Sequence, residues 1–300
     1  MGILLGVVAY GLWGLFPLYF HLLDDVSPVE VVANRVVWSL IFLGLLTSVT
    51  RTWARTIKAA RSVRSVVTLA IAAALLAVNW GIYVYAVATD QVVEASLGYF
   101  INPLVSVGLG VLVLRERLRP GQWAAVGIGA AAVGVLAVSY GRLPWISLAL
   151  AFSFGLYGLL KKQADVGAVE SLTIETAALA PVAVIVMVVF ASSGTSAMAN
   201  GDVTTHLLLV LLGPVTAIPL LAFGGAATRV PLSSLGLVQY LTPVLQFLLG
   251  VFFFDEVMSP LRWAGFLLVW ASLVVMSVDG LRNARSNRNA ADDLEVVVPD

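Results

Sequence analysis

The feature that most constrains this chain is a series of long apolar runs, each about long enough to cross a lipid bilayer. A spanning helix needs about 20 mainly apolar residues, and only helices or closed barrels satisfy their backbone polar groups in lipid. The apolar residues here follow one another without the alternation of a barrel strand. We count ten such runs, at approximately 3–23, 29–50, 66–88, 92–114, 121–140, 145–160, 169–192, 206–227, 231–254 and 261–280. The sequence therefore predicts an all-α integral membrane protein with ten transmembrane helices.

The composition excludes several other classes of protein. Of the 300 residues, 60% are hydrophobic and 11% are charged, whereas soluble globular domains are about a quarter charged. The net charge is zero and the charges do not gather on a basic face, so no nucleic-acid partner is expected. The chain has no cysteine, and its two histidines, His21 and His206, lie far apart. We therefore expect neither a metal site nor a cofactor.

The positions of Lys and Arg predict how the chain is oriented. With the N-terminus inside, the cytoplasmic segments hold 14 basic residues and the outer loops hold 2, with Arg35 inside a helix. Because basic residues concentrate on the cytoplasmic side, both termini are predicted to be cytoplasmic in a multi-pass protein of the plasma (inner) membrane. The first run lacks a basic n-region and a cleavage site, so we interpret it as a retained helix. Residues 282–300 form a polar cytoplasmic tail that we expect to be disordered.

The two halves of the chain resemble each other. Residues 99–124 and 239–264 share the order Pro, Gly-Val, Glu, Pro, Trp-Ala at an offset of 140. A weaker match, at an offset of 144, joins YGLWGL (10–15) to FGLYGL (154–159). The sequence thus predicts a duplication of five helices.

The predicted repeats are residues 1–141 and 142–281. Because five is odd, the second repeat begins on the opposite side of the membrane, so the two are inverted as in many secondary transporters. In such folds the substrate site lies near the midplane between the repeats. Transport is therefore the leading functional interpretation.

Five segments carry a resemblance to a known family. They are AYGLWGLFPLYF (9–20), NRVVWS (34–39), NWGIYVYAV (79–87), EASLGYFINPL (94–104) and ATRVPLSSLGLVQYLTP (227–243). These segments resemble the RarD-type members of the EamA branch of the drug/metabolite transporter superfamily. The resemblance covers nearly the whole chain apart from the tail, and it implies a ten-helix bundle around a central cavity that is open to one side at a time.

The sequence departs from the small multidrug pumps of the same superfamily. Those pumps exchange protons for drug at a carboxylate in their first helix, but residues 1–23 contain neither Asp nor Glu. That scheme of coupling therefore does not transfer to this chain.

Two symmetric prolines, Pro103 and Pro243, are predicted near the membrane midplane. A proline cannot bond to the carbonyl four residues before it, so we expect kinks that free the carbonyls of Tyr99 and Gln239. The alternative is a kink that serves packing alone. We expect these helices to line the cavity through Tyr99, Asn102, Pro103, Gln239, Tyr240 and Pro243.

Ionisable groups inside the spans are a stronger signal, since each costs about 2.5–3.5 kcal/mol at a helix centre by insertion scales. Arg35 lies about 10 Å from the start of its helix, and Glu175 is its counterpart in the second repeat. We hypothesise that one or both face the cavity, paired with each other or with a charged substrate group. A purely structural ion pair is the alternative. Glu94, beside Ser96, is either a gate or proton carrier or an interfacial cap.

Other candidates are weaker. Glu30 and Glu170 are expected to be structural, because the first turn of a helix favours a carboxylate, and Glu116 and Glu256 are expected to cap neighbouring helix ends. Cavity walls are predicted at Asn79, Trp80 and Tyr83 of the third helix and at the aromatic residues Tyr10, Trp13 and Tyr157. For Asn79 the alternative is a hydrogen bond between buried helices.

We therefore expect a secondary transporter of small metabolites or drug-like compounds that works by alternating access, and the resemblance implies export. Its partners are a small-molecule substrate and membrane lipid, while proton coupling and a homodimer are left open. No metal cluster, GxSxG motif or phosphate-binding loop indicates an enzyme. The alternatives are a flippase for a lipid-linked substrate, or a membrane receptor or scaffold without flux.

Overall fold

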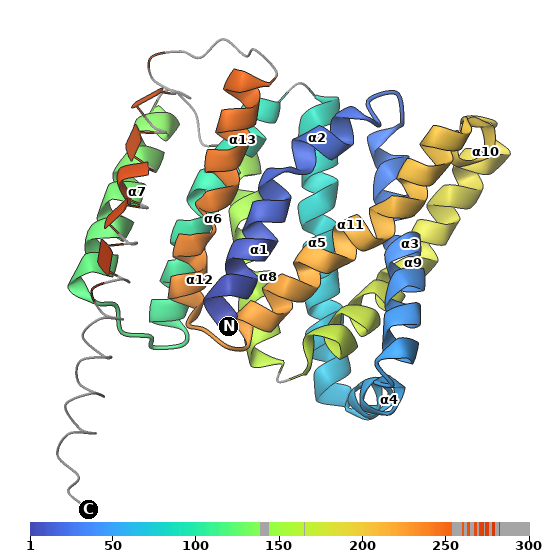
Figure 1. Cartoon of the computed structure of the whole chain (residues 1–300), viewed down its shortest axis with the longest axis horizontal. Coiled ribbons are helices and arrows are strands. Elements are labelled where there is room, and N and C mark those ends of the chain that lie inside the picture. Colours follow the sequence, from blue (N-terminus) through green and yellow to red (C-terminus); the bar gives the residue numbers. More distant parts are fainter. Residues whose placement is uncertain are drawn as a thin grey trace, which may run out of the picture.

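The computed structural model describes residues 1–89, 91–138, 144–164 and 166–253, together with scattered residues between 260 and 282. Over these residues the regular structure is entirely helical, as predicted (Figure 1). The helices are α1 (Gly2–Gly14), α2 (Phe16–His21), α3 (Pro28–Val49), α4 (Trp53–Arg61), α5 (Val63–Ala88), α6 (Val92–Leu112), α7 (Pro120–Val138), α8 (Trp145–Gln163), α9 (Ala168–Ser192), α10 (Ala197–Asn200), α11 (Val203–Ala227), α12 (Leu232–Val238) and α13 (Leu241–Phe252).

The long apolar helices agree with a membrane protein. Among the described residues, five segments are long and apolar enough to cross a bilayer: Gly2–His21, Pro28–Val49, Val63–Tyr83, Ala168–Ser192 and Val203–Ala227. A sixth segment, Leu97–Leu112, is apolar but shorter. The last predicted span, 261–280, is described only at scattered residues. The count of ten spans therefore stays a prediction.

The first predicted span consists of two helices, α1 and α2, joined at Leu15. Pro17 has no N–H to donate to the carbonyl of Trp13, so the helical ladder is interrupted there. The Nε2 group of Gln246, from α13, donates to that carbonyl at 3.4 Å. A backbone N–H at the end of α1 also donates to this carbonyl, so a side chain from the second half of the chain adds a second bond there.

The ninth predicted span, 231–254, is also divided, at Gln239 and Tyr240 between α12 and α13. The division lies one helical turn before Pro243, where the sequence predicts a freed carbonyl. The carbonyl of Gln239 is nevertheless occupied, because the backbone N–H of Thr242 donates to it at 3.1 Å. At the symmetric position α6 continues through Pro103 as one helix. The expectation that Gln239 offers a free carbonyl is therefore wrong.

The segment after α3, which lies between two predicted spans, forms a helix that the sequence analysis did not predict. This helix, α4, carries Arg55, Lys58 and Arg61, while Trp53 and Ile57 are exposed. An amphipathic helix of this kind suits the membrane interface, where basic groups meet lipid headgroups. It lies at the end of the bundle opposite to α10 (Figure 1).

The packing of the helices follows a pattern of pairs. Helix α3 packs on α9 and α11, α5 on α8 and α9, α1 on α11 and α13, and α6 on α8 and α12. The predicted repeat relates α1 to α8, α3 to α9, α5 to α11 and α6 to α12–α13. Under this relation each of these contacts corresponds to one that is also observed: α3–α11 corresponds to α9–α5, and α1–α11 corresponds to α8–α5. The inverted repeat and its boundaries stay predictions, and this pairing supports them.

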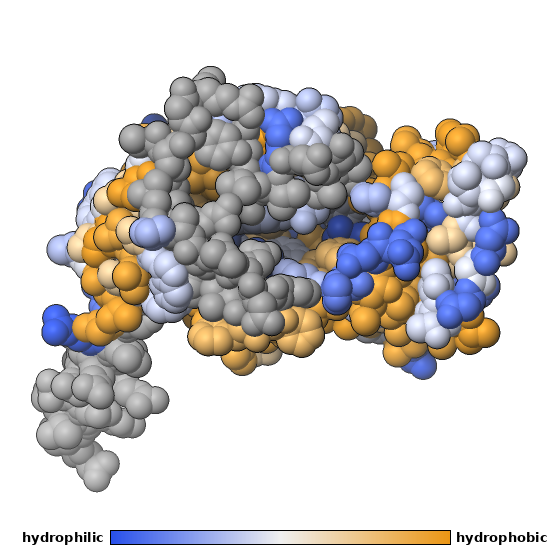
Figure 2. Space-filling model, turned by 90° about the horizontal axis from the view of Figure 1, so that it is seen from above, coloured by the Kyte–Doolittle hydropathy of each residue, from blue (hydrophilic) through white to orange (hydrophobic). Residues whose placement is uncertain are grey.

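The interior and the exterior of the bundle are both apolar. The largest buried cluster joins α1, α3, α8 and α11 around Tyr10, Leu43, Tyr157 and Phe223. Bulky apolar side chains also cover the outside, for example Ile185 of α9. Seen from one end of the bundle, hydrophobic side chains form much of the rim and hydrophilic ones gather on the face between (Figure 2). This distribution fits a protein surrounded by lipid.

Helices α3 and α11 approach each other closely at Gly213. A Cβ atom added there would lie 2.5 Å from the backbone oxygen of Trp38. The approach also brings the Ser39 hydroxyl within hydrogen-bonding distance of the Gly213 carbonyl, at 3.1 Å. Small residues at such crossings allow helix backbones to pack in membranes.

We predict that Gly213→Ala lowers the free energy of unfolding by about 1–3 kcal/mol, because the new methyl group forces α3 and α11 apart. The measurement is the thermal unfolding temperature of the purified protein in detergent. Gly127→Ala on α7 is the matched control, since nothing lies within 4 Å of its added Cβ. Equal unfolding temperatures for the two variants would contradict the close crossing.

Candidate functional site

A cavity of about 220 Å³ lies inside the bundle. Its walls come from α1, α2, α3, α5, α6, α8, α11, α13 and the junction between α12 and α13. Of the residues predicted from the sequence, the walls include Tyr10, Trp13, Arg35, Asn79, Trp80, Tyr83, Tyr99, Asn102, Gln239 and Pro243. The structure thus brings together residues that are up to 233 positions apart in the chain (Tyr10 to Pro243).

The cavity lies in one half of the bundle. Its lining comes from the C-terminal half of α5 and the N-terminal halves of α6 and α8. These halves meet at the end where α2 lies, away from α4 (Figure 1).

Aromatic rings occupy the space toward the α4 end. Phe154 lies on the cavity wall, and its ring centroid is 5.3 Å from that of Phe223. Phe223 in turn stacks on Tyr157, with 5.7 Å between the centroids. Tyr10 completes the cluster, at 6.2 Å from Phe223. These packed rings separate the cavity from the α4 end of the bundle.

Arg35 is the charged group of the cavity wall. Its Nε atom donates to the hydroxyl of Thr216 on α11 at 3.0 Å. Three aromatic rings surround the guanidinium, with its central carbon 4.6 Å from the ring centroid of Trp80, 5.5 Å from Phe20 and 5.9 Å from Phe16. Such rings stabilise a cation through their negative faces. Among the described residues, no carboxylate is within ion-pair distance of Arg35.

Two asparagines on the cavity wall differ in how they are satisfied. The Nδ2 group of Asn79 donates to the carbonyl of Leu150 and to the hydroxyl of Ser153, both at 2.9 Å. Asn79 therefore lines the cavity and also joins α5 to α8, which unites the two alternatives weighed from the sequence. Asn102 is 4% exposed, and within the described part of the chain its Oδ1 atom has no hydrogen-bond partner.

Several predicted residues lie elsewhere. Pro103, Tyr157 and Tyr240 are not among the residues that line the cavity. The carbonyl of Pro103 packs against Gly236, whose added Cβ would lie 2.9 Å away. Tyr157 and Tyr240 are buried side chains. The side chains of Glu94 and Ser96 lie outside the described residues.

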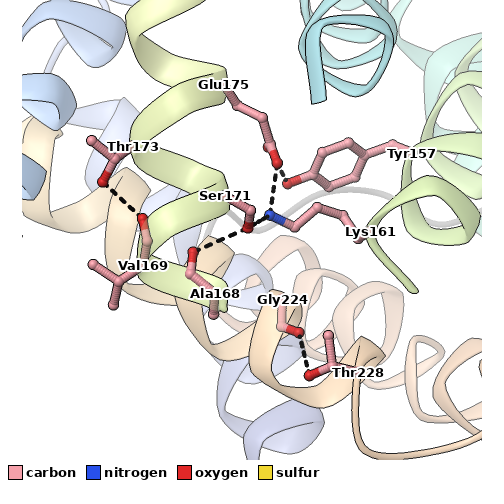
Figure 3. Close-up of polar contacts among 9 residues, drawn as sticks. All are labelled: Tyr157, Lys161, Ala168, Val169, Ser171, Thr173, Glu175, Gly224 and Thr228. Atoms are coloured by element: carbon pink, nitrogen blue, oxygen red, sulfur yellow. Dashed lines mark hydrogen bonds and ion pairs between the residues drawn. The ribbon is translucent and has the colours of Figure 1, made fainter. Parts of the chain in front are cut away.

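Glu175 belongs to a second site that the sequence analysis did not foresee (Figure 3). Its Oε1 atom pairs with Lys161 of α8 at 2.8 Å, and its Oε2 accepts from the Tyr157 hydroxyl at 3.1 Å. Lys161 also donates to Ser171 at 2.5 Å. Both partners are almost fully buried, at 2% and 1% exposure for Lys161 and Glu175. Glu175 thus pairs with Lys161 and not with Arg35.

The sequence analysis counted Lys161 among the basic residues of the cytoplasmic segments. In the structure α8 extends to Gln163 and carries Lys161 within it, where its side chain is buried. The available signal was Glu175 itself, since a carboxylate buried inside a span requires a cation within reach. Glu175 and Arg35 nonetheless line one small pocket together, next to the main cavity.

Three other carboxylates join the two predicted repeats. Glu30 accepts from the backbone N–H groups of Ala197 and Met198 at the start of α10, at 2.9 and 3.1 Å. Glu170 pairs with Arg55 of α4 at 3.2 Å. Glu116 accepts from the N–H of Leu232 at 2.7 Å, where α12 begins. The predicted capping role of Glu116 is therefore confirmed, while Glu256 lies outside the described residues.

Comparison with known proteins places the chain among transporters. The model of the EamA-like transporter family matches residues 1–140. A Protein RarD from Streptomyces exfoliatus is 53% identical over 287 residues, which cover 96% of this chain and 91% of that protein. An uncharacterized transporter from Vibrio cholerae is 42% identical over 96% of each chain. A solved crystal structure matches 94% of this chain and 98% of its own, with a TM-score of 0.72 and 21% identity, which concerns the fold alone.

We predict that Glu175→Gln destabilises the protein by about 3–5 kcal/mol, because it leaves the Lys161 ammonium buried without a counter-charge. The double variant Lys161→Met with Glu175→Leu is the control. It removes both charges at similar volume and should recover most of the loss. Thermal unfolding in detergent measures both. A double variant as unstable as the single one would contradict the ion-pair explanation.

Proposed function

We propose that this chain, which belongs to the EamA-like transporter family as a RarD-type member, carries small metabolites or drug-like compounds across the membrane through the cavity at Arg35. One observation carries the proposal. A cavity with polar and aromatic walls lies in one half of the bundle, and packed aromatic rings close it toward the other end. A transporter that opens to one side at a time requires this arrangement.

Alternating access is the mechanism that the packing of the helices supports. If the repeats are residues 1–141 and 142–281, the cavity lies between them, with Arg35 and Asn102 from the first and Gln239 from the second. Rocking of one repeat against the other would close the bundle at the α2 end, where the cavity lies, and would separate the aromatic rings toward the α4 end. No partner chain is needed to form this cavity, so the proposal does not depend on a homodimer.

The orientation that we propose places α4 and both termini in the cytoplasm of a cell with this protein in its inner membrane. The basic residues of α4 and the N-terminus lie at the same end of the bundle (Figure 1). The cavity described above is then on the outer side. We propose export as the direction of transport, with a cytoplasm-facing state that loads the substrate.

Flux distinguishes this proposal from its alternatives. A flippase for a lipid-linked substrate moves no small solute, and a receptor or scaffold binds without flux. An imposed pH gradient adds a second distinction, between downhill facilitation and coupling to protons through Glu175 or Glu94.

We predict saturable uptake of at least one member of a mixed amino-acid and metabolite panel by proteoliposomes that contain the purified protein. Arg35→Ala and Asn102→Ala should each reduce that flux to the level of empty vesicles, because both remove polar groups from the cavity wall. Trp123→Phe is the matched control, since Trp123 of α7 is exposed on the outside of the bundle. Flux equal to that of empty vesicles from a correctly folded protein would favour a lipid-linked cargo or a receptor role.

We also predict that single cysteines report the orientation directly, since the natural chain contains none. Ser193→Cys, between α9 and α10, should react with a membrane-impermeant maleimide in intact cells. Ser62→Cys, between α4 and α5, should react only after lysis. Both serines are exposed, and serine and cysteine are nearly isosteric. The reverse pattern of labelling would place the termini outside.

A further inference from the structure

We propose that the cavity selects small organic anions that also carry a hydrogen-bond donor, with Arg35 binding the anionic group and Asn102 accepting from the donor. This inference rests on the proposed function and names the class of substrate for the same cavity. It follows from two polar groups of the wall whose bonding capacity the described residues leave unused.

The first group is the guanidinium of Arg35. It carries a full positive charge in the interior of a membrane protein, where an uncompensated charge is strongly unfavourable. Among the described residues, only its Nε atom has a hydrogen-bond partner, the hydroxyl of Thr216. The described residues on the cavity wall include no Asp, Glu, Lys or His, so Arg35 is the one charged side chain among them.

The nearest acidic candidate is already occupied. Glu175 shares a small pocket with Arg35, but its two oxygens bind Lys161 and Tyr157. The positive charge of Lys161 compensates the negative charge of Glu175. The charge of Arg35 therefore has no counter-charge among the described residues. A planar guanidinium offers parallel donors that match the two oxygens of a carboxylate. An anion bound in the cavity would therefore supply the counter-charge for Arg35 that the described residues do not provide.

The second group is the side-chain carbonyl of Asn102. Asn102 is on the cavity wall, and its Oδ1 atom is buried with no partner among the described residues, whereas the Nδ2 group of Asn79 on the same wall donates to two acceptors. A buried acceptor without a partner is unfavourable. A substrate hydroxyl or N–H group that reaches Asn102 removes that cost, so the cavity should distinguish substrates with such a donor.

The remaining wall fits a compact apolar body. The rings of Phe16, Phe20 and Trp80 lie around the guanidinium, and Trp13 and Phe154 are also on the wall. Flat, apolar groups pack well against such rings.

Four probes of nearly equal shape test the proposal: mandelate, phenylacetate and the methyl ester of each. The acids differ from each other in the hydroxyl group, and each ester differs from its acid in the loss of the charge and the gain of one methyl group. Binding is measured from the ligand dependence of the unfolding temperature of purified protein in detergent. We expect each carboxylate to bind roughly ten- to hundredfold more tightly than its ester, and mandelate more tightly than phenylacetate.

Variants assign each preference to its residue. Arg35→Gln should abolish the preference for carboxylates and leave the binding of the esters unchanged, while Arg35→Lys keeps part of it because the charge remains. Asn102→Ala should keep the preference for carboxylates and lose that for the hydroxyl. Esters that bind the wild-type protein as tightly as the acids, or carboxylates that do not bind at millimolar concentration, would overturn the proposal. These two results need no variant, so the test holds even if Arg35→Gln fails to fold.

Flux of the same probes into proteoliposomes separates this inference from the proposed function. Transport without a preference for the acids overturns the anion selectivity and leaves a transporter. A clear preference in binding without transport of any probe supports the selectivity and contradicts the transport function.

Discussion

The need to satisfy polar groups without water governs this structure from the backbone to the cavity. Where Pro17 interrupts the ladder of the first span, a backbone N–H at the end of α1 and the side chain of Gln246 both donate to the carbonyl of Trp13. Where Glu175 is buried, Lys161 is buried with it. Against this background the few unsatisfied groups stand out. Arg35 and Asn102 face one cavity with capacity to spare, and that is why we assign the substrate to them.

Carboxylates also hold the two halves of the chain together at both ends of the bundle. Glu30 reaches from α3 to α10, and Glu170 reaches from α9 to α4, so each half contacts the short helix in a long connection of the other. Glu116 bonds the start of α12 in the same manner. Contacts between N–H groups and a carboxylate are strong and directional. Any rocking of the halves must therefore preserve or exchange these contacts, which lie outside the cavity.

The sequence was sufficient for much of the fold and for part of the site. Helix positions followed from the length of apolar runs, because lipid imposes that length on any spanning helix. Some residues on the cavity wall, such as Arg35 and Asn79, could be predicted because a polar side chain inside a spanning helix is unfavourable in lipid. Prediction failed where the outcome depended on a partner elsewhere in the chain. Lys161 stands at the end of a helix and looked solvated, and only the fold shows Glu175 beside it. Pro103 lies on the expected helix and Tyr240 lies at the junction of α12 and α13, but both contact other neighbours, since the rotation of a helix depends on its packing.

The substitute bond at the interruption of the first span has a mechanical consequence. The bond from Gln246 to the carbonyl of Trp13 is long, at 3.4 Å, and both residues are on the wall of the cavity. A hinge at Leu15 can therefore open with the loss of this long bond and of the backbone bond to the same carbonyl, beside a polar space and not beside lipid. Pro17 ensures that no continuous helix has to melt for α2 to swing. The junction between α1 and α2 can thus bend at a low cost in free energy, at the level where a solute would have to pass.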